Sequence, residues 1–283
     1  MPLLGALTLR EIKPATVEQW AADLRRRGDG APSILRASAV LSGILQRAVV
    51  NGLIESNPVR AVRRPRQAPP RQPDPIPPAL IEAIRAQLEP RDATLVSLLA
   101  YAGLRPESEA LPLTWRQVGD RSLSVYASKT GRERQVRLLG PLADDLAAWR
   151  KLSESGGPAS SRNPQTARPP LVFPPPGGAW TPTAWQNWRR RVWRPAALAA
   201  GLPADSRPRD LRASFASLLI AEGRSVVDVA QQLGHSPATC LRSYARAFAE
   251  FDLEGRETAE AAIRSARCAS SVHRGGEAPT AGQ

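Results

Sequence analysis

Arginine, histidine and tyrosine side chains stand at short, ordered spacings in the stretch from residue 207 to residue 248. Arg209 and Arg212 form an Arg-x-x-Arg pair, His235 follows Leu-Gly, and Tyr244 lies nine residues after that histidine. Guanidinium groups offer parallel donors that match phosphate oxygens, and they stay charged at any working pH. A tyrosine hydroxyl can form a covalent intermediate when neighbouring groups activate it. These residue types therefore favour chemistry on a phosphate group.

Three predicted helices position these residues. The first starts near Arg207. Because successive residues of a helix are about 100° apart around its axis, both arginines lie beside the face that packs on the core. The second has Ser225 as its N-cap and ends at Gly234, which suits a C′ position. The third opens with a cap followed by Pro237 and carries the tyrosine.

The order of these boxes resembles the C-terminal part of the tyrosine recombinases, the phage-integrase and Xer family. On that resemblance Arg212 matches the second arginine of the family's site, His235 its Leu-Gly-His histidine, and Tyr244 its nucleophile. Arg209 stands where the family usually has a histidine. The chain's other histidine is His273, so no nearby histidine can take that place.

The segment GLRPESEALPLTW resembles the family's first box and supplies Arg105. The family usually places an acidic residue three positions after this arginine and a tryptophan nine positions after it. Here Glu107 and Glu109 follow by two and four positions, and Trp115 by ten, as after a one-residue insertion. One extra residue turns the rest of a helix by about 100°. The support beneath Arg105 is therefore predicted to differ from the family's.

A β-hairpin is predicted from the alternating stretches 122–126 and 135–139, which flank the segment SKTGRERQ. Lys129 resembles the family's hairpin lysine, and Gly131 suits a turn that needs positive φ. Lys129 is one of three lysines among 39 lysine and arginine residues, which favours a position that needs a titratable ammonium. The alternative is a solvated turn lysine.

Composition points to a polyanionic partner. The chain has 283 residues and a formal net charge of +13 that arginine supplies, which favours nucleic acid. An arginine-rich genome composition is the alternative explanation. Cys240 and Cys268 lie far apart without zinc-ligand spacing, which indicates a reducing cytoplasm. No apolar run of membrane-spanning length and no signal peptide are evident, so we expect a soluble protein.

Residues 1–63 predict two helices, one from Thr16 and one after Ser33, too few to bury a core alone. They resemble the latter part of the family's helical core-binding domain, which the resemblance implies is truncated here. Residues 64–78 contain seven prolines and three arginines, and predict an extended linker that is either a DNA-gripping strap or a plain spacer. Residues 79–267 are expected to form the catalytic domain.

Residues 268–283 are predicted to be a disordered tail. The expected fold is mainly α (α+β): a helical tyrosine-recombinase catalytic domain with a small β-hairpin sheet, preceded by the partial core-binding domain. Within the catalytic domain, the helix TPTAWQNWRRRVWRPAALAAG interleaves tryptophans with arginines. Buried tryptophans with arginines reaching past them to solvent are favoured there over DNA contact.

The resemblance implies that the chain cuts and rejoins DNA through a 3′-phosphotyrosine, without cofactor, metal or ATP. Arg105 and Arg212 would clamp the phosphate, and His235 would donate to a non-bridging oxygen. Lys129 would protonate the departing 5′ oxygen. Arg209 cannot accept the tyrosine's proton, although it could contact phosphate or lower the tyrosine's pKa.

The implied partner is double-stranded DNA, bound by a homotetramer on synapsed sites in the cytoplasm, with accessory DNA-bending proteins and no membrane. Two alternatives stay open. One is a degenerate relative that binds DNA without cutting it, which Arg209 and the insertion after Arg105 favour. The other is a type IB topoisomerase, against which the Leu-Gly-His-to-Tyr spacing and the small N-terminal domain argue.

Overall fold

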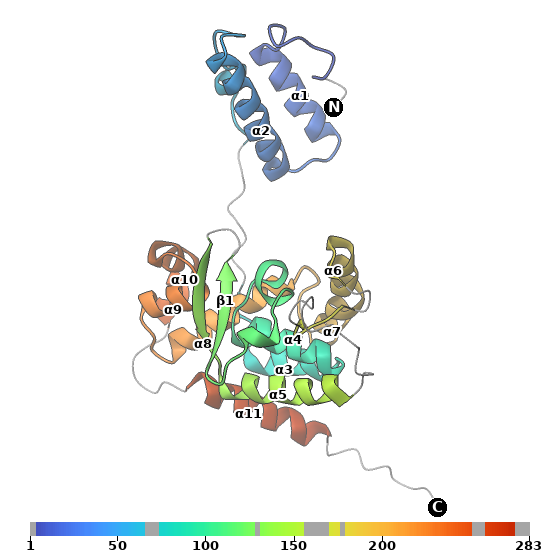
Figure 1. Ribbon diagram of the computed structural model, residues 1–283, viewed down its shortest axis with the longest axis vertical. Coiled ribbons are helices and arrows are strands. Elements are labelled where there is room, and N and C mark those ends of the chain that lie inside the picture. Colours follow the sequence, from blue (N-terminus) through green and yellow to red (C-terminus); the bar gives the residue numbers. More distant parts are fainter. Residues whose placement is uncertain are drawn as a thin grey trace, which may run out of the picture. The chain divides into compact units, whose positions relative to one another are not determined.

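A computed structural model describes residues 4–65, 74–127, 131–155, 170–175, 179–250 and 258–274. The chain divides into two compact units, Met1–Arg71 and Gln72–Gln283, and Figure 1 colours both along the sequence. The division falls within the predicted linker 64–78, of which residues 66–73 lie outside the described residues.

Two helices make up most of the first unit, α1 (Pro14–Arg26) and α2 (Ala31–Val50), followed by the 3-10 turn η1 (Pro58–Ala61). The helices start two and three residues earlier than predicted, because each has a proline in its first turn, where a missing N–H costs no hydrogen bond. The two helices and the segment before α1 share an apolar cluster of Leu4, Ile12, Val17, Trp20 and Leu45.

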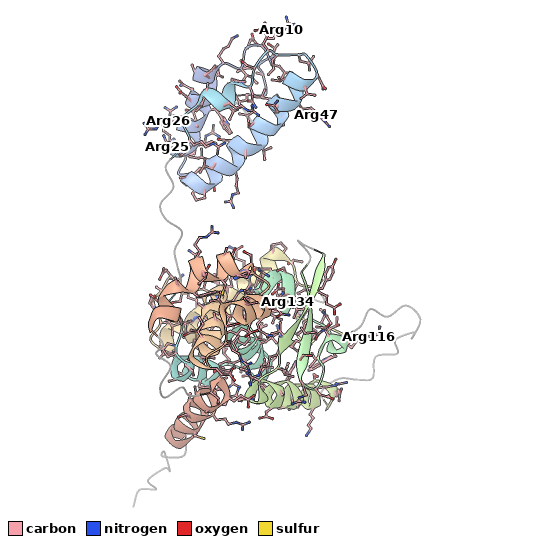
Figure 2. The ribbon with its side chains drawn as sticks, turned by 90° about the vertical axis from the view of Figure 1, so that its left-hand side faces the viewer. Arg10, Arg25, Arg26, Arg47, Arg116 and Arg134 are labelled. Atoms are coloured by element: carbon pink, nitrogen blue, oxygen red, sulfur yellow. The ribbon has the colours of Figure 1, made fainter. Side chains whose placement is uncertain are left out.

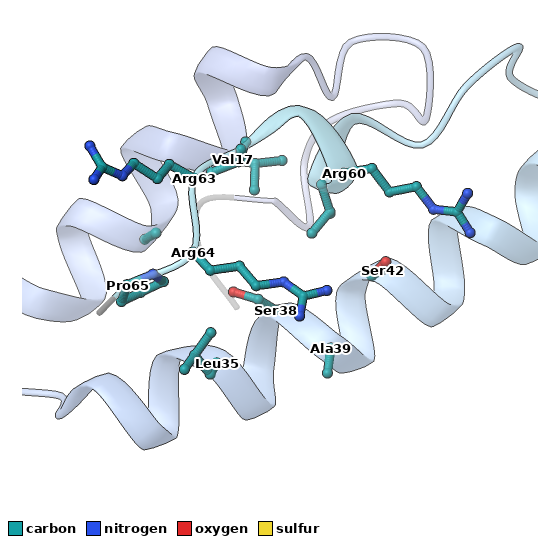
Figure 3. A pocket seen from close by; sticks show the side chains of 12 residues that line it. Val17, Leu35, Ser38, Ala39, Ser42, Arg60, Arg63, Arg64 and Pro65 are labelled. Carbon is teal, nitrogen blue, oxygen red and sulfur yellow. The ribbon is translucent and has the colours of Figure 1, made fainter. Parts of the chain in front are cut away.

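A groove of about 600 Å³ lies between the two helices of this unit. Ser38, Ala39 and Ser42 of α2 line one side, and Arg64 lies across them in Figure 3. Arginines also stand on the surface of the unit, among them Arg10, Arg25, Arg26 and Arg47 (Figure 2). The unit therefore presents basic side chains to its surroundings.

Helix α2 leaves part of its apolar surface open, including Val40, Ile44 and Val50. Among the described residues it is the one helix that is long and apolar enough to cross a membrane by length and composition alone. Core helices of non-membrane proteins have the same character, and α2 buries Ile34 and Leu45 within its unit.

The second unit is built around α4 (Pro90–Tyr101), in which all residues from Thr94 to Tyr101 are buried. A helix that is buried all round lies in a core rather than at a surface. It packs against α3 (Pro78–Ala86), α5 (Gly140–Ser155) and α8 (Leu211–Ala221) (Figure 1). Helix α9 (Val226–Leu233) follows α8 in the chain, and α10 (Pro237–Glu250) packs against both α8 and α9.

The arginine- and tryptophan-rich segment forms α6 (Pro182–Trp188), the π-helical turn η4 (Arg189–Trp193) and α7 (Arg194–Ala199). Its tryptophans Trp185, Trp188 and Trp193 are buried, and the arginines between them are exposed. The prediction of tryptophans in the core is thereby confirmed. Trp185 and Trp188 stack with ring centroids 4.8 Å apart.

The predicted hairpin consists of β1 (Ser122–Ala127) and β2 (Arg132–Arg137), which pair antiparallel with Ala127 opposite Arg132. The second strand begins three residues earlier than predicted, since Gly131, at φ 65°, turns the chain directly before it. Lys129 lies in the loop outside the described residues.

The last helix, α11 (Ala259–Arg274), packs against α3 and α5 (Figure 1). It continues seven residues past the predicted boundary at residue 267, into the segment expected to be disordered. Ala259 and Ile263 bury one face of the helix, and Arg267 anchors the next turn through ion pairs. Those contacts hold the helix as far as residue 267, from which it continues to Arg274. Residues 275–283 lie outside the described residues.

Candidate active site

The segment after α4 meets the consecutive helices α8, α9 and α10, which lie more than 100 residues later in the sequence. Gly103 follows α4 at φ 60°, and a Cβ there would stand 2.6 Å from Cδ1 of Phe215. Only glycine therefore lets the backbone pass this close to α8. The close passage brings the Gly103 carbonyl within reach of Arg212.

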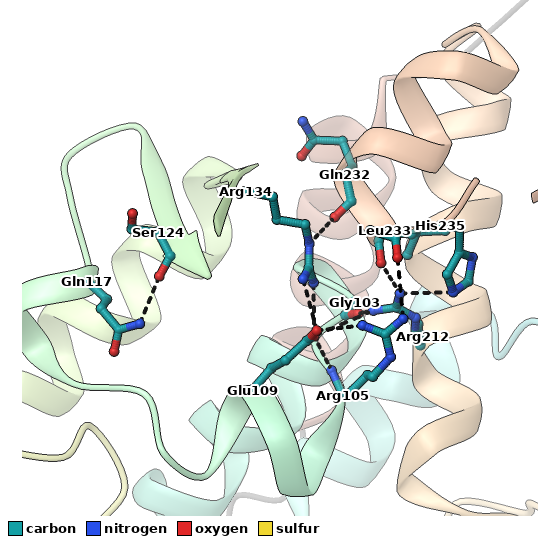
Figure 4. A network of polar contacts seen from close by, with 11 residues as sticks. Gly103, Arg105, Glu109, Gln117, Ser124, Arg134, Arg212, Gln232, Leu233 and His235 are labelled. Atoms are coloured by element: carbon teal, nitrogen blue, oxygen red, sulfur yellow. Dashed lines mark hydrogen bonds and ion pairs between the residues drawn. The ribbon is translucent and has the colours of Figure 1, made fainter. Parts of the chain in front are cut away.

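Arg212 is buried at the start of α8 and fastens three segments together. Its guanidinium donates to the carbonyls of Gly103 and Leu233, and Nη2 lies 3.1 Å from Nε2 of His235 (Figure 4). Burial, and then the positive charge of Arg105, lower the pKa of Arg212 to about 9. The group remains a cation at neutral pH, held at a fixed position.

Glu109 is the carboxylate on which the arginines of the site converge (Figure 4). It accepts from the backbone N–H of Arg105 at 2.8 Å and from Nη1 of the same residue at 2.6 Å. Arg134 donates to both carboxylate oxygens, each at 2.9 Å, and Nη1 of Arg212 lies 3.8 Å away. Burial alone would raise the pKa of Glu109, but hydrogen bonds from Arg134 and Arg105 lower it to about 2.

The one-residue insertion after Arg105 is absorbed by a π-helical turn, η2 (Pro106–Ala110). The N–H of Ala110 donates to the carbonyl of Arg105, and Leu111 to that of Pro106, both at 3.0 Å. These i→i+5 bonds take up one residue without ending the helical turn. Glu109 therefore reaches Arg105 from four positions away and supports it despite the inserted residue.

Glu107, the other candidate acid of this box, is exposed and faces a different element. Its carboxylate accepts from the indole N–H of Trp185 on α6 at 2.7 Å. The two glutamates thus have separate contacts, one at the arginines and one at α6.

His235 follows the left-handed Gly234 that ends α9. Because a guanidinium can only donate, Nε2 of His235 must accept from Arg212, and the ring proton must then sit on Nδ1. Nδ1 is buried and has no hydrogen-bond partner among the described residues. Burial, then the charges of Arg212 and Arg105, lower the pKa of His235 to about 4. The ring is therefore neutral at physiological pH and has an N–H donor to offer.

Tyr244 lies on α10, partly buried, with its ring nearly parallel to that of His235 and the centroids 6.4 Å apart. Burial raises the pKa of the Tyr244 hydroxyl, and the positive charge of Arg212 opposes that rise. Arg105 and Arg209 act in the same direction as Arg212. The tyrosine thus stands within the field of the arginine cluster.

Arg209 lies in the 3-10 turn η5 (Pro208–Asp210), directly before α8, with an exposed side chain. Of the predicted site residues, the structure brings together Arg105, Arg212, His235 and Tyr244, with Arg209 near enough to act on the tyrosine's charge. Lys129 lies outside the described residues.

The sequence analysis did not identify Arg134 as a site residue, and it did not decide whether Glu107 or Glu109 supports Arg105. Strand alternation held a signal for Arg134, because it shares a strand face with Val136, which is fully buried. A charged side chain on a buried face needs a partner of opposite charge. The side chain of Arg134 is 9% exposed and that of Glu109 1%.

Comparison with known proteins gives the same picture. Residues 77–250 match the Phage integrase family. Tyrosine recombinase XerC of Agrobacterium fabrum is 32% identical over 247 residues, covering 83% of this chain and 74% of that protein. Tyrosine recombinase XerD of Corynebacterium glutamicum is 30% identical over 255 residues, covering 85% and 80%.

Solved structures share the fold at lower identity. The Tn1549 transposon integrase in complex with circular intermediate DNA superposes with a TM-score of 0.68 at 18% identity, covering 87% of this chain and 88% of that one. A λ integrase dimer bound to a core site gives 0.64 at 19% identity, covering 90% and 85%.

Proposed function

The chain belongs to the phage integrase family, and we propose that it uses Tyr244 to cut and rejoin DNA as a site-specific recombinase. The observation that carries this assignment is the convergence of Arg105, Arg212, His235 and Tyr244 from separate elements onto one site. The relatives XerC and XerD are tyrosine recombinases, and the fold is that of integrases solved on DNA.

In the proposed cleavage step, the Tyr244 oxygen attacks the scissile phosphorus and the bond to the 5′ oxygen breaks. The product is a 3′-phosphotyrosine and a free 5′-hydroxyl. A second 5′-hydroxyl can then attack the phosphotyrosine, which rejoins the DNA and returns the tyrosine. Since each bond broken is matched by a bond formed, the sequence of steps needs neither metal nor ATP.

Extra negative charge develops on the phosphate in this step, and two guanidiniums are assigned to it. Arg105 keeps a 32% exposed side chain that can take up a ligand, whereas Arg212 is buried behind it. Both are fixed before substrate arrives, by Glu109 and by backbone carbonyls. Prearranged donors of this kind stabilise developing charge without the cost of reorganisation.

His235 is proposed to act as a neutral donor. The lowered pKa of about 4 keeps the ring neutral, and a neutral ring carries one N–H that would donate to a non-bridging phosphate oxygen. Lys129 is proposed to give a proton to the departing 5′ oxygen, as the hairpin lysine of the family would. Arg209 cannot take the proton of Tyr244, and its charge instead favours the tyrosinate.

The proposed partner is double-stranded DNA, and the proposed assembly is a homotetramer on two synapsed sites, with accessory DNA-bending proteins. A λ integrase tetramer of the same fold has been solved on a Holliday junction. The exposed arginines and the net charge of +13 suit binding to DNA phosphates. The proposed location is the cytoplasm, where a recombinase of this kind would meet its DNA.

A suicide substrate tests the proposal. A duplex carrying the crossover site and a nick next to the scissile phosphate loses its short 5′-hydroxyl strand after cleavage, so the covalent adduct accumulates. The parent should form a protease-sensitive protein–DNA adduct, and Tyr244→Phe should form none while binding the same DNA within about tenfold, since only one hydroxyl is lost. Binding by the parent without any adduct would support the degenerate DNA-binding alternative.

A further inference from the structure

Arg134 is a buried arginine that the proposed reaction does not yet use. It lies on β2 with its side chain directed inward, away from solvent, toward Glu109 (Figure 4). Both of its terminal nitrogens donate to the two oxygens of that carboxylate, and Nε donates to the carbonyl of Gln232 at 3.0 Å. All three nitrogens of the guanidinium therefore have partners in two other elements.

Arg134, on the β-hairpin, therefore fixes the orientation of the Glu109 carboxylate. A bidentate arginine–carboxylate pair holds the carboxylate plane as well as its position. Arg105 then donates to the same carboxylate from the opposite side, through Nη1 and its backbone N–H. Arg105 is the more exposed arginine of the two, and Glu109 is the only carboxylate among the described residues with which it is paired.

The second contact of Arg134 fixes the end of α9. Gln232 stands three residues before His235, and the side chain of Arg134 also lies 3.1 Å from where a Cβ on Gly234 would be. A larger residue than glycine at position 234 would therefore press on Arg134. The hairpin, the arginine pair and the histidine loop meet at this one guanidinium.

A purely structural role is the simpler alternative, and the same strand provides an example of one. Arg137 also pairs with a carboxylate, donating from Nη1 to both oxygens of Glu222 at 2.8 and 2.7 Å, but its side chain touches none of Glu109, Arg105 or Arg212 in the described structure. Its ion pairs link β2 to the end of α8 and to α11. Arg137 is therefore the matched control for Arg134.

We propose that Arg134 is a positioning residue that acts through Glu109 to hold Arg105 in place against the scissile phosphate. The inference rests on the proposed function and adds to it the residue that sets the geometry of the first arginine. It predicts a defect in stabilising phosphate charge, since that is what Arg105 supplies.

The test compares Arg134→Met, Arg134→Lys and Arg137→Met in single-turnover cleavage of the nicked substrate. A misplacement of about 1 Å can cost about 10²-fold, so Arg134→Met should cleave about 10- to 100-fold more slowly than the parent. Arg134→Lys should remain slow, because an ammonium keeps the charge but cannot form the planar two-point contact. Arg137→Met should stay within a few-fold of the parent.

A second substrate separates positioning from a general loss of structure. A methylphosphonate at the scissile position replaces a non-bridging oxygen by a methyl group and removes the charge that Arg105 stabilises. The difference between Arg134→Met and the parent should shrink to a few-fold on this substrate, whereas a structural defect would persist on both.

Two results would overturn the inference alone: a parent-like rate for Arg134→Met or Arg134→Lys on phosphate DNA, or an equal defect on both substrates. A parent that binds the site but forms no adduct on either substrate would instead overturn the proposed function, and the inference with it. Melting curves and DNA binding, measured for every variant, identify any that fails to fold. In that event Arg134→Lys, which retains the buried charge, decides the outcome.

Discussion

Two of the arginine–carboxylate clusters in the second unit differ in charge balance. At the junction of α3, α5 and α11, Arg85 and Arg267 share Glu82 and Asp145, so two cations meet two anions. Tyr101 completes this cluster with a 2.5 Å hydrogen bond to Glu82.

At the candidate active site the described side chains leave a surplus of positive charge. Arg105, Arg134 and Arg212 gather on the single carboxylate of Glu109, and His235 is neutral. Buried charge is costly unless it is paired, so a surplus of cations is kept only where an anion will arrive. The balanced cluster holds α11 against α3 and α5, whereas the cluster with surplus positive charge is suited to binding a phosphate.

The largest expected effect comes from replacing one arginine of each cluster by lysine: the change should lower cleavage activity at the candidate active site and lower stability at the junction of α3, α5 and α11. Arg105→Lys should reduce single-turnover cleavage by about 10²–10³-fold, because a positioned donor to the developing charge is lost. Arg267→Lys should leave that rate within a few-fold and lower the melting temperature, since it loosens α11. Equal losses of cleavage in both variants would remove the distinction.

Arg209 adds positive charge to the active-site cluster but cannot act as a base. Because imidazole can accept a proton near neutral pH, Arg209→His should raise the cleavage rate there by up to about 10²-fold. Arg209→Ala should be no faster than the parent, because it removes a cation and restores no base. Single-turnover rates across pH 6–8 check this. A histidine variant slower than the parent would mean that Arg209 is a useful phosphate contact.

An anion should stabilise the parent through the unbalanced cluster alone. Inorganic phosphate should raise the melting temperature by a few degrees more than sodium chloride does at equal ionic strength, since a ligand that binds only the folded state stabilises it. Arg105→Ala should lose most of this gain, and Arg267→Ala should keep it. A gain that persists in Arg105→Ala would place the anion elsewhere.

The smallest effect concerns acid stability. The pKa of His235 is lowered from 6.5 to about 4, so between these values the unfolded chain holds a proton that the folded chain does not. This group therefore destabilises the fold as pH falls from about 6.5 toward 4. His235→Gln should show a smaller drop in melting temperature between pH 7 and pH 5 than the parent, with His273→Gln as the matched control. An unchanged drop in His235→Gln would show that the ring is not held neutral.

Caps and apolar spacing are local signals, and they predicted the helices; which segments meet at the site was implied by the resemblance of the ordered boxes to the family. The π-helical turn at Pro106–Ala110 was not predicted. In the sequence, an extra residue taken up by an i→i+5 hydrogen bond looks the same as one that shifts the helical register. Nor could spacing choose between Glu107 and Glu109, which only the partners Arg134 and Trp185 distinguish.

The extent of α11 was missed for a related reason. Arg267 reads as a solvated residue in a polar C-terminal segment, and its partners Glu82 and Asp145 lie more than 100 residues away in the sequence. Long-range ion pairs of this kind are invisible to periodicity. The same holds for Arg134, whose partner Glu109 belongs to another box.

The measurement that tests the central claim most directly is the identity of the residue joined to DNA. The chain has three tyrosines, of which Tyr101 is fully buried and Tyr126, on β1, is exposed. The adduct from the nicked substrate can be digested with nuclease and protease, and the modified peptide sequenced by mass spectrometry. The account predicts a nucleotide remnant on Tyr244 and on no other residue; a remnant on Tyr126 would contradict it.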